Sequence, residues 1–243
     1  MRILLLLTLT ITVLTSCWDL QTGQAIREVA PGTWRGVFKL EDQVVPIMYE
    51  IRNSNNIDQP VELIFKTAQQ ELKADQVTIL GDTLFADFNS ANTQLKIIHQ
   101  IDQMDGFLYD QSGKEYPIIF AGVYGILQRF PDVRKTPTAN LTGDWKLIAT
   151  VAQDSTLEGI LRITTKDNYA TATLKLNHKN QTMVLEGTVQ GSKIYLSGFD
   201  GKTVCWLSAN IKDSKTLNQG NLKLNNKNFF WEAQSNAGII HSN

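Results

Sequence analysis

Hydrophobic and polar residues alternate along most of the chain between residues 32 and 233, in short runs that are typical of half-buried β-strands. Polar turn residues such as Glu41-Asp42, Asp200-Gly201 and Asn225-Asn226 separate the runs. No stretch of twelve residues keeps a 3.6-residue apolar period, although residues 120–128 could form one or two helical turns. The pattern therefore predicts an all-β fold built as an antiparallel meander.

The predicted strands form two sets of eight, separated by residues 128–140. This segment contains two prolines among charged residues and loses the alternation, so we interpret it as a linker. It divides the chain into a first β-barrel domain at residues 31–127 and a second at residues 141–235, followed by a tail at residues 236–243. The predicted strands are 32–40, 43–52, 61–67, 77–80, 84–88, 95–101, 106–109 and 116–121, then 143–151, 157–165, 169–177, 182–189, 193–199, 203–211, 216–224 and 229–233.

The two sets of strands share landmarks at a nearly constant offset of 110 or 111 positions, which predicts an internal duplication. Closing each set into a small barrel would leave no exposed strand edge. We therefore expect two tandem antiparallel barrels of the calycin-like kind, with a pair of open sandwiches as the alternative. The paired landmarks are Gly32-Thr33-Trp34 with Gly143-Asp144-Trp145, Gly81 with Gly191, and Phe88 with Phe199.

The first seventeen residues have the pattern of a secretory signal. Met1-Arg2 precedes an apolar run of 11 residues from Ile3 to Val13, and the segment ends in Leu14-Thr15-Ser16-Cys17. The run would be about 16 Å long as a helix, which is too short to cross a hydrocarbon core of about 30 Å. Its ending resembles the lipobox of bacterial lipoproteins.

This resemblance implies that residues 1–16 are removed as a lipoprotein signal peptide and that Cys17 carries a diacylglyceryl group and a further acyl chain such as palmitate. Residues 17–30 are polar and without periodicity, so we expect a tether there. An ordinary cleavage site followed by a free cysteine is the alternative. No other segment approaches eighteen consecutive apolar residues. We therefore expect a protein anchored in the bacterial cell envelope, facing the periplasm and not spanning the membrane.

The charge balance excludes one class of function, and the cysteine content makes a second class less favoured. The 24 acidic and 23 basic residues nearly cancel, so the basic field that nucleic-acid binding needs is missing. Lipid on Cys17 would leave Cys205 without a disulfide partner, since the chain has two cysteines. Strand alternation places Cys205 on one face with Leu207 and Ala209, so we expect a buried and inert thiol, with a reactive cysteine as the alternative.

The common catalytic and metal-binding motifs are absent from the sequence, including Gly-x-Ser-x-Gly, His-Glu-x-x-His and Cys-x-x-Cys. The histidines at positions 99, 178 and 241 are isolated, and the acidic residues gather at predicted turns, where they favour local backbone hydrogen bonds. We expect Trp34 and Trp145 to fill the barrel cores. The sequence thus predicts no catalytic residue, no cofactor and no metal site, and His99, His178 and His241 are interpreted as structural or solvated.

Three segments together resemble a known family: Gly32 to Val37, Val45-Pro46-Ile47 and Leu196 to Gly201. They are similar to the N-terminal, non-catalytic region of TlpA- or redoxin-type thiol-disulfide oxidoreductase lipoproteins of Bacteroidetes-like bacteria, over residues 30–235. The chemistry of that family lies in a thioredoxin-like domain with a Trp-Cys-x-x-Cys motif, which these 243 residues do not contain. The resemblance therefore implies a stand-alone copy of the module, which we expect to act beside a separate thioredoxin-like protein.

Two functions remain open from the sequence. The first is a non-enzymatic interaction or accessory module on a lipid anchor. The second is a small-ligand-binding β-barrel lipoprotein, because the start at residues 141–145 is similar to avidin-like and other calycin barrels. A ligand barrel needs an interior with space, whereas large inward side chains would fill it. The predicted inward residues are bulky, which favours the first function: Leu157, Leu161, Ile163, Leu174, Leu176, Leu185 and Leu196.

Overall fold

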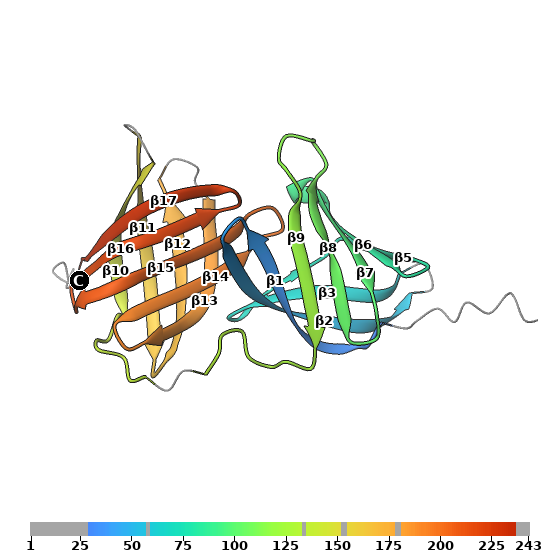
Figure 1. The fold of residues 1–243 in the computed structure, drawn as a ribbon, viewed down its shortest axis with the longest axis horizontal. Coiled ribbons are helices and arrows are strands. Elements are labelled where there is room, and N and C mark those ends of the chain that lie inside the picture. Colours follow the sequence, from blue (N-terminus) through green and yellow to red (C-terminus); the bar gives the residue numbers. More distant parts are fainter. Residues whose placement is uncertain (1–28, 57–58, 133–134, 152–154, 178–180, 237–243) are drawn as a thin grey trace, which may run out of the picture.

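Most of the chain folds into β-strands, so the predicted all-β fold is confirmed (Figure 1). Two curved β-structures lie side by side, and we call them the first half, up to residue 127, and the second half, from residue 141. Residues 1–28, with Cys17 and most of the tether, lie outside the described residues, as do His178 and His241. The computed structural model describes residues 29–56, 59–132, 135–151, 155–177 and 181–236.

The first half is a nine-stranded antiparallel sheet that curls into a half-barrel (Figure 1). Its strand order is β4-β3-β2-β1-β9-β8-β7-β6-β5, so β1 and β9 are neighbours and β4 and β5 form the two edges. A short 3-10 helix, η1 (Asn89–Ala91), connects β6 to β7. The strands are β1 (Gly32–Leu40), β2 (Gln43–Asn56), β3 (Gln59–Thr67), β4 (Gln70–Lys73), β5 (Gln76–Leu80), β6 (Thr83–Phe88), β7 (Thr93–His99), β8 (Gln103–Asp110) and β9 (Ile118–Tyr124).

The second half is a closed antiparallel barrel of eight strands, in which each strand pairs with the next and β17 returns to pair with β10. Closure pairs both edges of the meander, as the sequence predicted for this half. The strands are β10 (Gly143–Val151), β11 (Ser155–Lys166), β12 (Tyr169–Leu176), β13 (Gln181–Gln190), β14 (Lys193–Phe199), β15 (Val204–Asp213), β16 (Thr216–Leu224) and β17 (Lys227–Ser235).

The structure differs from the predicted strands at three places in the first half. Strand β4 was not predicted, because Gln70–Lys73 is mostly polar and lies exposed at a sheet edge. Strand β2 continues to Asn56 through residues that the sequence marked as a loop, and it pairs there with β3. The possible helix at residues 120–128 is absent, since β9 pairs with β1 and β8 up to Tyr124 and no helix follows.

The strand that corresponds to β13 is interrupted in the first half. Strands β1–β3 match β10–β12 in order, and β6–β9 match β14–β17, which leaves β4 and β5 in the place of β13. The two residues between them change partners: the Ala74 N–H donates to Leu63 O at 2.9 Å, and the Asp75 N–H donates to Asp87 O at 2.8 Å. This exchange moves the chain from β3 to β6 and explains why the first half curls without closing as a barrel.

The two halves open with the same local structure. The indole N–H of Trp34 donates to Ala30 O at 2.9 Å, and that of Trp145 donates to Leu141 O at 2.8 Å. Gly32 and Gly143 stand two residues before these tryptophans with φ angles of 123° and 145°, a region that residues with a Cβ rarely adopt. In each repeated Gly-x-Trp pattern, the glycine thus allows the chain to turn, and the tryptophan holds the turn by a hydrogen bond to the carbonyl four residues earlier.

Each half has its own core of large apolar side chains. The first core is rich in aromatic rings, including Trp34, Phe38 and Phe65. The barrel core is mostly aliphatic around Trp145. The inward prediction for the barrel is confirmed, with Leu157 packing at the margin of the core and six residues buried within it: Leu161, Ile163, Leu174, Leu176, Leu185 and Leu196.

Candidate functional site

The outer surface of the barrel packs into the core of the first half. Strands β14 and β15 present Phe199, Val204 and Trp206 to the first half, and all three are buried in its core. The ring centroid of Phe199 lies 4.9 Å from that of Phe65 and 5.5 Å from that of Phe88. Trp206 therefore faces the neighbouring half of the molecule.

A buried arginine from the predicted linker holds the polar part of this interface. The Arg129 guanidinium donates to Ser197 O at 3.1 Å and to Lys66 O, and it pairs with Glu186 at 3.2 Å. Ser197 Oγ in turn donates to Pro46 O at 2.5 Å. Burial lowers the pKa of Arg129, while the charge of Glu186 opposes that shift. These contacts connect three segments that are distant in sequence, so we assign Arg129 a structural role.

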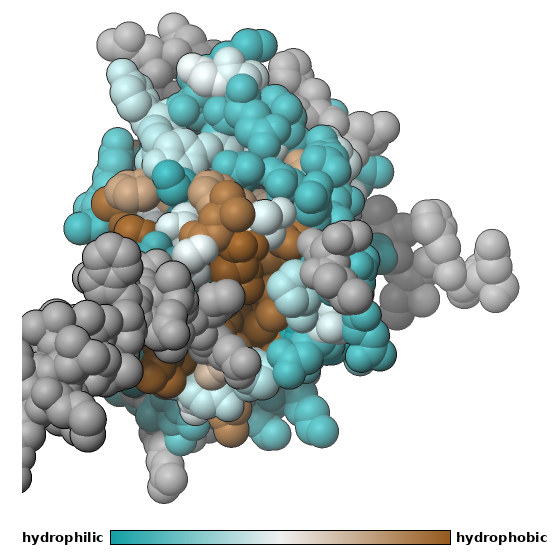
Figure 2. All heavy atoms as spheres, turned by 90° about the vertical axis from the view of Figure 1, so that its right-hand side faces the viewer, coloured by the Kyte–Doolittle hydropathy of each residue, from teal (hydrophilic) through white to brown (hydrophobic). Residues whose placement is uncertain are grey.

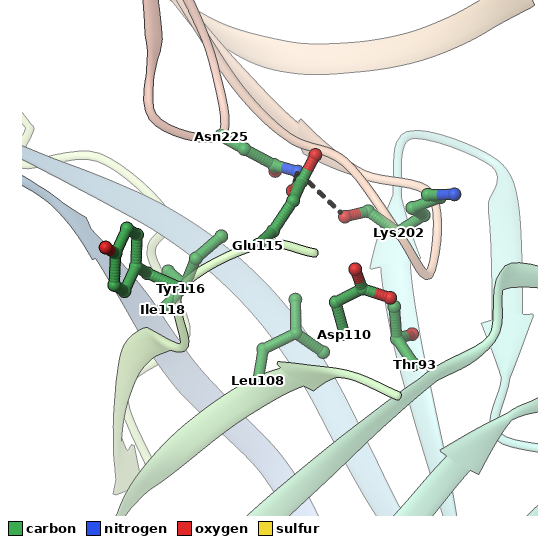
Figure 3. Close-up of a pocket in the computed structure, with 8 residues that line it drawn as sticks. All are labelled: Thr93, Leu108, Asp110, Glu115, Tyr116, Ile118, Lys202 and Asn225. Carbon is green, nitrogen blue, oxygen red and sulfur yellow. Dashed lines mark hydrogen bonds between the residues drawn. The ribbon is translucent and has the colours of Figure 1, made fainter. Parts of the chain in front are cut away.

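A small pocket lies where the loop after β8 meets the turns of the barrel (Figure 3). Its open space is about 260 Å³, which includes solvent at its mouth. Asn225 donates to the Glu115 carboxylate at 2.9 Å and to Lys202 O at 3.3 Å. The Asp110 carboxylate accepts hydrogen bonds from the backbone and hydroxyl of Ser112. Both carboxylates therefore accept hydrogen bonds from other residues of the protein, and the hydrogen bond between Glu115 and Asn225 joins the two halves at this pocket.

The structure places the described cysteine where the sequence predicted. Cys205 on β15 is buried in the barrel core together with Leu207 and Ala209. Burial raises the pKa of the Cys205 thiol, so the thiolate is disfavoured and nucleophilic or redox chemistry at this sulfur is suppressed. Cys17, the predicted lipidation site, lies outside the described residues, and the lipid anchor stays a prediction.

His99 has an environment that the sequence did not indicate. Its side chain is 1% exposed, and neither ring nitrogen has a hydrogen-bond partner among the described residues. Burial lowers the pKa of His99, and the nearby charge of Asp82 opposes that shift. Among the described residues, no group of three histidines, cysteines or carboxylates is arranged to hold a metal ion. His99 is therefore a neutral core residue in this structure.

Exposed aliphatic side chains lie at the same end of strands β5, β7 and β9 of the first half, which we call the apolar end: Leu80, Ile98, Ile101 and Val123. Figure 2 views the first half from the side away from the barrel and shows apolar residues, in brown, gathered near the centre of that face with polar residues around them. Sequence reasoning missed this surface, because Ile97 and Ile98 look alike in a hydrophobic pattern although only Ile97 points into the core.

Within the described ranges, no helix has the length and apolarity to span a membrane.

Comparisons with known proteins give weak similarities. No family model and no curated protein matches the sequence. The haemoglobin receptor HpuA from Kingella denitrificans is 11% identical with a TM-score of 0.29, covering 91% of this chain and 92% of that one. A putative outer membrane protein from Bacteroides fragilis is 13% identical with a TM-score of 0.26, covering 84% and 96%. A DUF3598 protein of unknown function from Nostoc punctiforme is 10% identical with a TM-score of 0.28, covering 84% and 95%. Similarities at this level carry no argument about function.

Proposed function

We propose that this protein is a lipid-anchored, periplasm-facing cell-envelope protein that acts as a non-enzymatic interaction module. The observation that carries the proposal is the N-terminal pattern: a charge, an apolar run too short to span a bilayer, and Leu14-Thr15-Ser16-Cys17. The residues that the structure describes begin close behind it, at residue 29. A cysteine in this position offers the thioether that attaches the chain to lipid.

The chemistry of the described residues supports the non-enzymatic part of the proposal. The Cys205 thiol is buried with a raised pKa, and the Arg129 guanidinium is used between the halves. The carboxylates at the pocket accept hydrogen bonds from neighbouring side chains. Large side chains occupy the barrel core, which supports an interaction module over a ligand-binding barrel.

A separate thioredoxin-like protein is the partner that we propose, on the basis of the resemblance at residues 32–37, 45–47 and 196–201. The structure adds that much of the last segment is not free to bind. Leu196, Ser197 and Phe199 are buried in the barrel or against the first half. A partner would therefore contact other surfaces, and covalent capture through Cys205 is not expected. Crosslinking in cells, followed by identification of the captured protein, tests this part of the proposal.

The lipid anchor is tested by labelling cells with an alkyne analogue of palmitate. We expect the wild-type protein to incorporate the label and to fractionate with membranes, and Cys17→Ala to lose both properties. Cys205→Ala is the matched control, because it removes the other cysteine and should keep the label. Label that persists in Cys17→Ala would contradict the proposal.

A further inference from the structure

The side chains of the apolar end come from three strands, β5, β7 and β9, and from the β7–β8 turn. Leu80 and Ile98 both pair with Thr83, from opposite sides, so they lie two strands apart on one face. Ile101 follows in the β7–β8 turn, and Val123 on β9 pairs with Gln103 at the end of that turn. The exposed fractions are 65% for Leu80, 54% for Ile98, 66% for Ile101 and 43% for Val123. Aliphatic side chains gathered on one surface in this way indicate a contact site.

The chain arrives from the N-terminus at this same end. Val29, the first described residue, is buried in the first core, and the indole of Trp34 binds Ala30 O. Backbone hydrogen bonds tie this region to the turn that bears Ile101, since the Tyr124 N–H donates to Asp102 O and the Gly125 N–H donates to Thr33 O, each at 3.0 Å. The start of the described chain therefore lies near the β7–β8 turn that bears Ile101.

The length of the tether sets how far this end can lie from a bilayer. Twelve residues lead from Cys17 to Val29, and they span at most about 40 Å when fully extended. A lipid at Cys17 would thus hold the apolar end at high effective concentration over the membrane surface, so a weak contact would be well populated.

We propose that the apolar end rests on the lipid surface, with its aliphatic side chains in the interfacial region and the barrel pointing away from the membrane. This inference rests on the lipid anchor of the proposed function. A lipid surface is favoured over a second copy of the chain because the chain outside the structure leads to Cys17, the proposed site of the lipid. The charged neighbours of the apolar end are mixed, with Asp82, Asp102 and Asp105 opposed by Lys96 on β7 and by Arg35, which pairs with Val123, so contact depends on apolar insertion more than on attraction to anionic lipids.

The test uses the full lipidated chain in vesicles of phosphatidylethanolamine and phosphatidylglycerol. Ile101→Cys and, as the matched control, Phe230→Cys are each labelled with an environment-sensitive fluorophore. Phe230 lies on β17 of the barrel and is 67% exposed, so the two labelled sites have similar accessibility. Cys205 stays unlabelled because it is buried. Vesicle flotation reports the anchor, and quenching by lipids that carry a spin label near the headgroup reports contact with the bilayer.

We expect flotation of both variants, with quenching at position 101 at least about twofold stronger than at position 230 and unchanged when the anionic lipid fraction is raised. Adding Leu80→Asp to the Ile101→Cys chain should reduce the quenching while flotation persists. Flotation with equal, weak quenching at both positions would overturn the docking and leave the anchor intact. Loss of flotation would overturn the anchor and the docking together. Crosslinking between two copies at position 101, without quenching, would identify a second copy as the occupant and overturn the lipid contact.

Discussion

Strand β13 of the barrel and the β4–β5 pair of the first half occupy corresponding places, yet only β13 is one continuous strand. It pairs with β12 on one side and with β14 on the other, and the barrel closes. In the first half, β4 pairs with β3 and β5 pairs with β6, so the equivalent strand has one partner at a time. Phe199 contacts Phe65 of β3 and Phe88 of β6, the strands on either side of the interruption. The half that closes on itself thus completes the core of the half that does not.

The largest effect in this comparison is expected from Phe199→Ala. The ring packs among Phe38, Phe65 and Phe88, and its loss leaves a cavity where the two halves meet. We expect the free energy of unfolding to fall by about 4 kcal/mol, measured by urea denaturation. Phe230→Ala, at an exposed position of the barrel, is the control and should change the urea midpoint little. Equal effects of the two substitutions would show that the barrel does not complete the first core.

Arg129→Met tests the polar part of the same interface. The substitution removes the arginine donor from the Lys66 and Ser197 carbonyls and the cationic partner from Glu186, which keeps the hydrogen bond from the Ala68 N–H at 2.6 Å. We expect a loss of about 3 kcal/mol in the free energy of unfolding, at the lower end for a broken buried pair because Glu186 keeps some exposure.

The double variant Arg129→Met with Glu186→Gln serves as the control, since it removes the unpaired charge and should recover part of the loss. Arg162→Met breaks a solvent-exposed pair with Asp144 and should be almost neutral. A smaller loss for Arg129→Met than for Arg162→Met would contradict the structural role of Arg129.

The paired tryptophans test whether the two halves open in equivalent ways. Trp34→Phe and Trp145→Phe each remove one indole hydrogen bond to the carbonyl four residues earlier. We expect each to cost about 1–3 kcal/mol, with the larger loss at Trp145, because Leu141 is buried whereas Ala30 is half-buried and its carbonyl has better access to water. Urea midpoints of the two variants provide the measurement, and a larger loss at Trp34 would contradict the expected order.

Local pattern was sufficient to predict most strands and insufficient to predict contacts between the halves. The strands Gly32–Leu40, Gly143–Val151 and Lys193–Phe199 have the predicted bounds, since alternation and turn residues act within a few positions. The burial of Arg129 depends on Lys66 and Ser197, which are more than sixty positions away. A charged residue at the start of a linker that contains prolines looks solvated until the fold is known. Likewise, Phe88 and Phe199 were visible as matching positions, but their ring contact was not.

The smallest effect is expected from His99, the one buried histidine among the described residues. Its titration should make the stability of the first half, and not that of the barrel, depend on pH. Burial lowers the pKa of His99 below its ordinary value of 6.5, so the folded state favours the neutral ring. Above pH 6.5 the ring is neutral in both the folded and the unfolded state, so His99 does not lower the stability. As the pH falls from 6.5 towards the lowered pKa, the unfolded state takes up the proton first, and the free energy of unfolding decreases by at most about 1.4 kcal/mol per pH unit. Glu50, whose pKa is lowered to about 2 by hydrogen bonds from Arg52 and Lys66, acts at lower pH and does not overlap with this window.

Urea midpoints between pH 7.5 and pH 5 measure this dependence, and amide hydrogen exchange assigns it to one half. We expect protection to fall first in β7 and its neighbours β6 and β8, while the barrel strands keep theirs. His99→Leu removes the titrating ring and should flatten the profile in this window. A profile that His99→Leu leaves unchanged would show that another group senses pH and that the polar ring of His99 is tolerated in the first core in both protonation states.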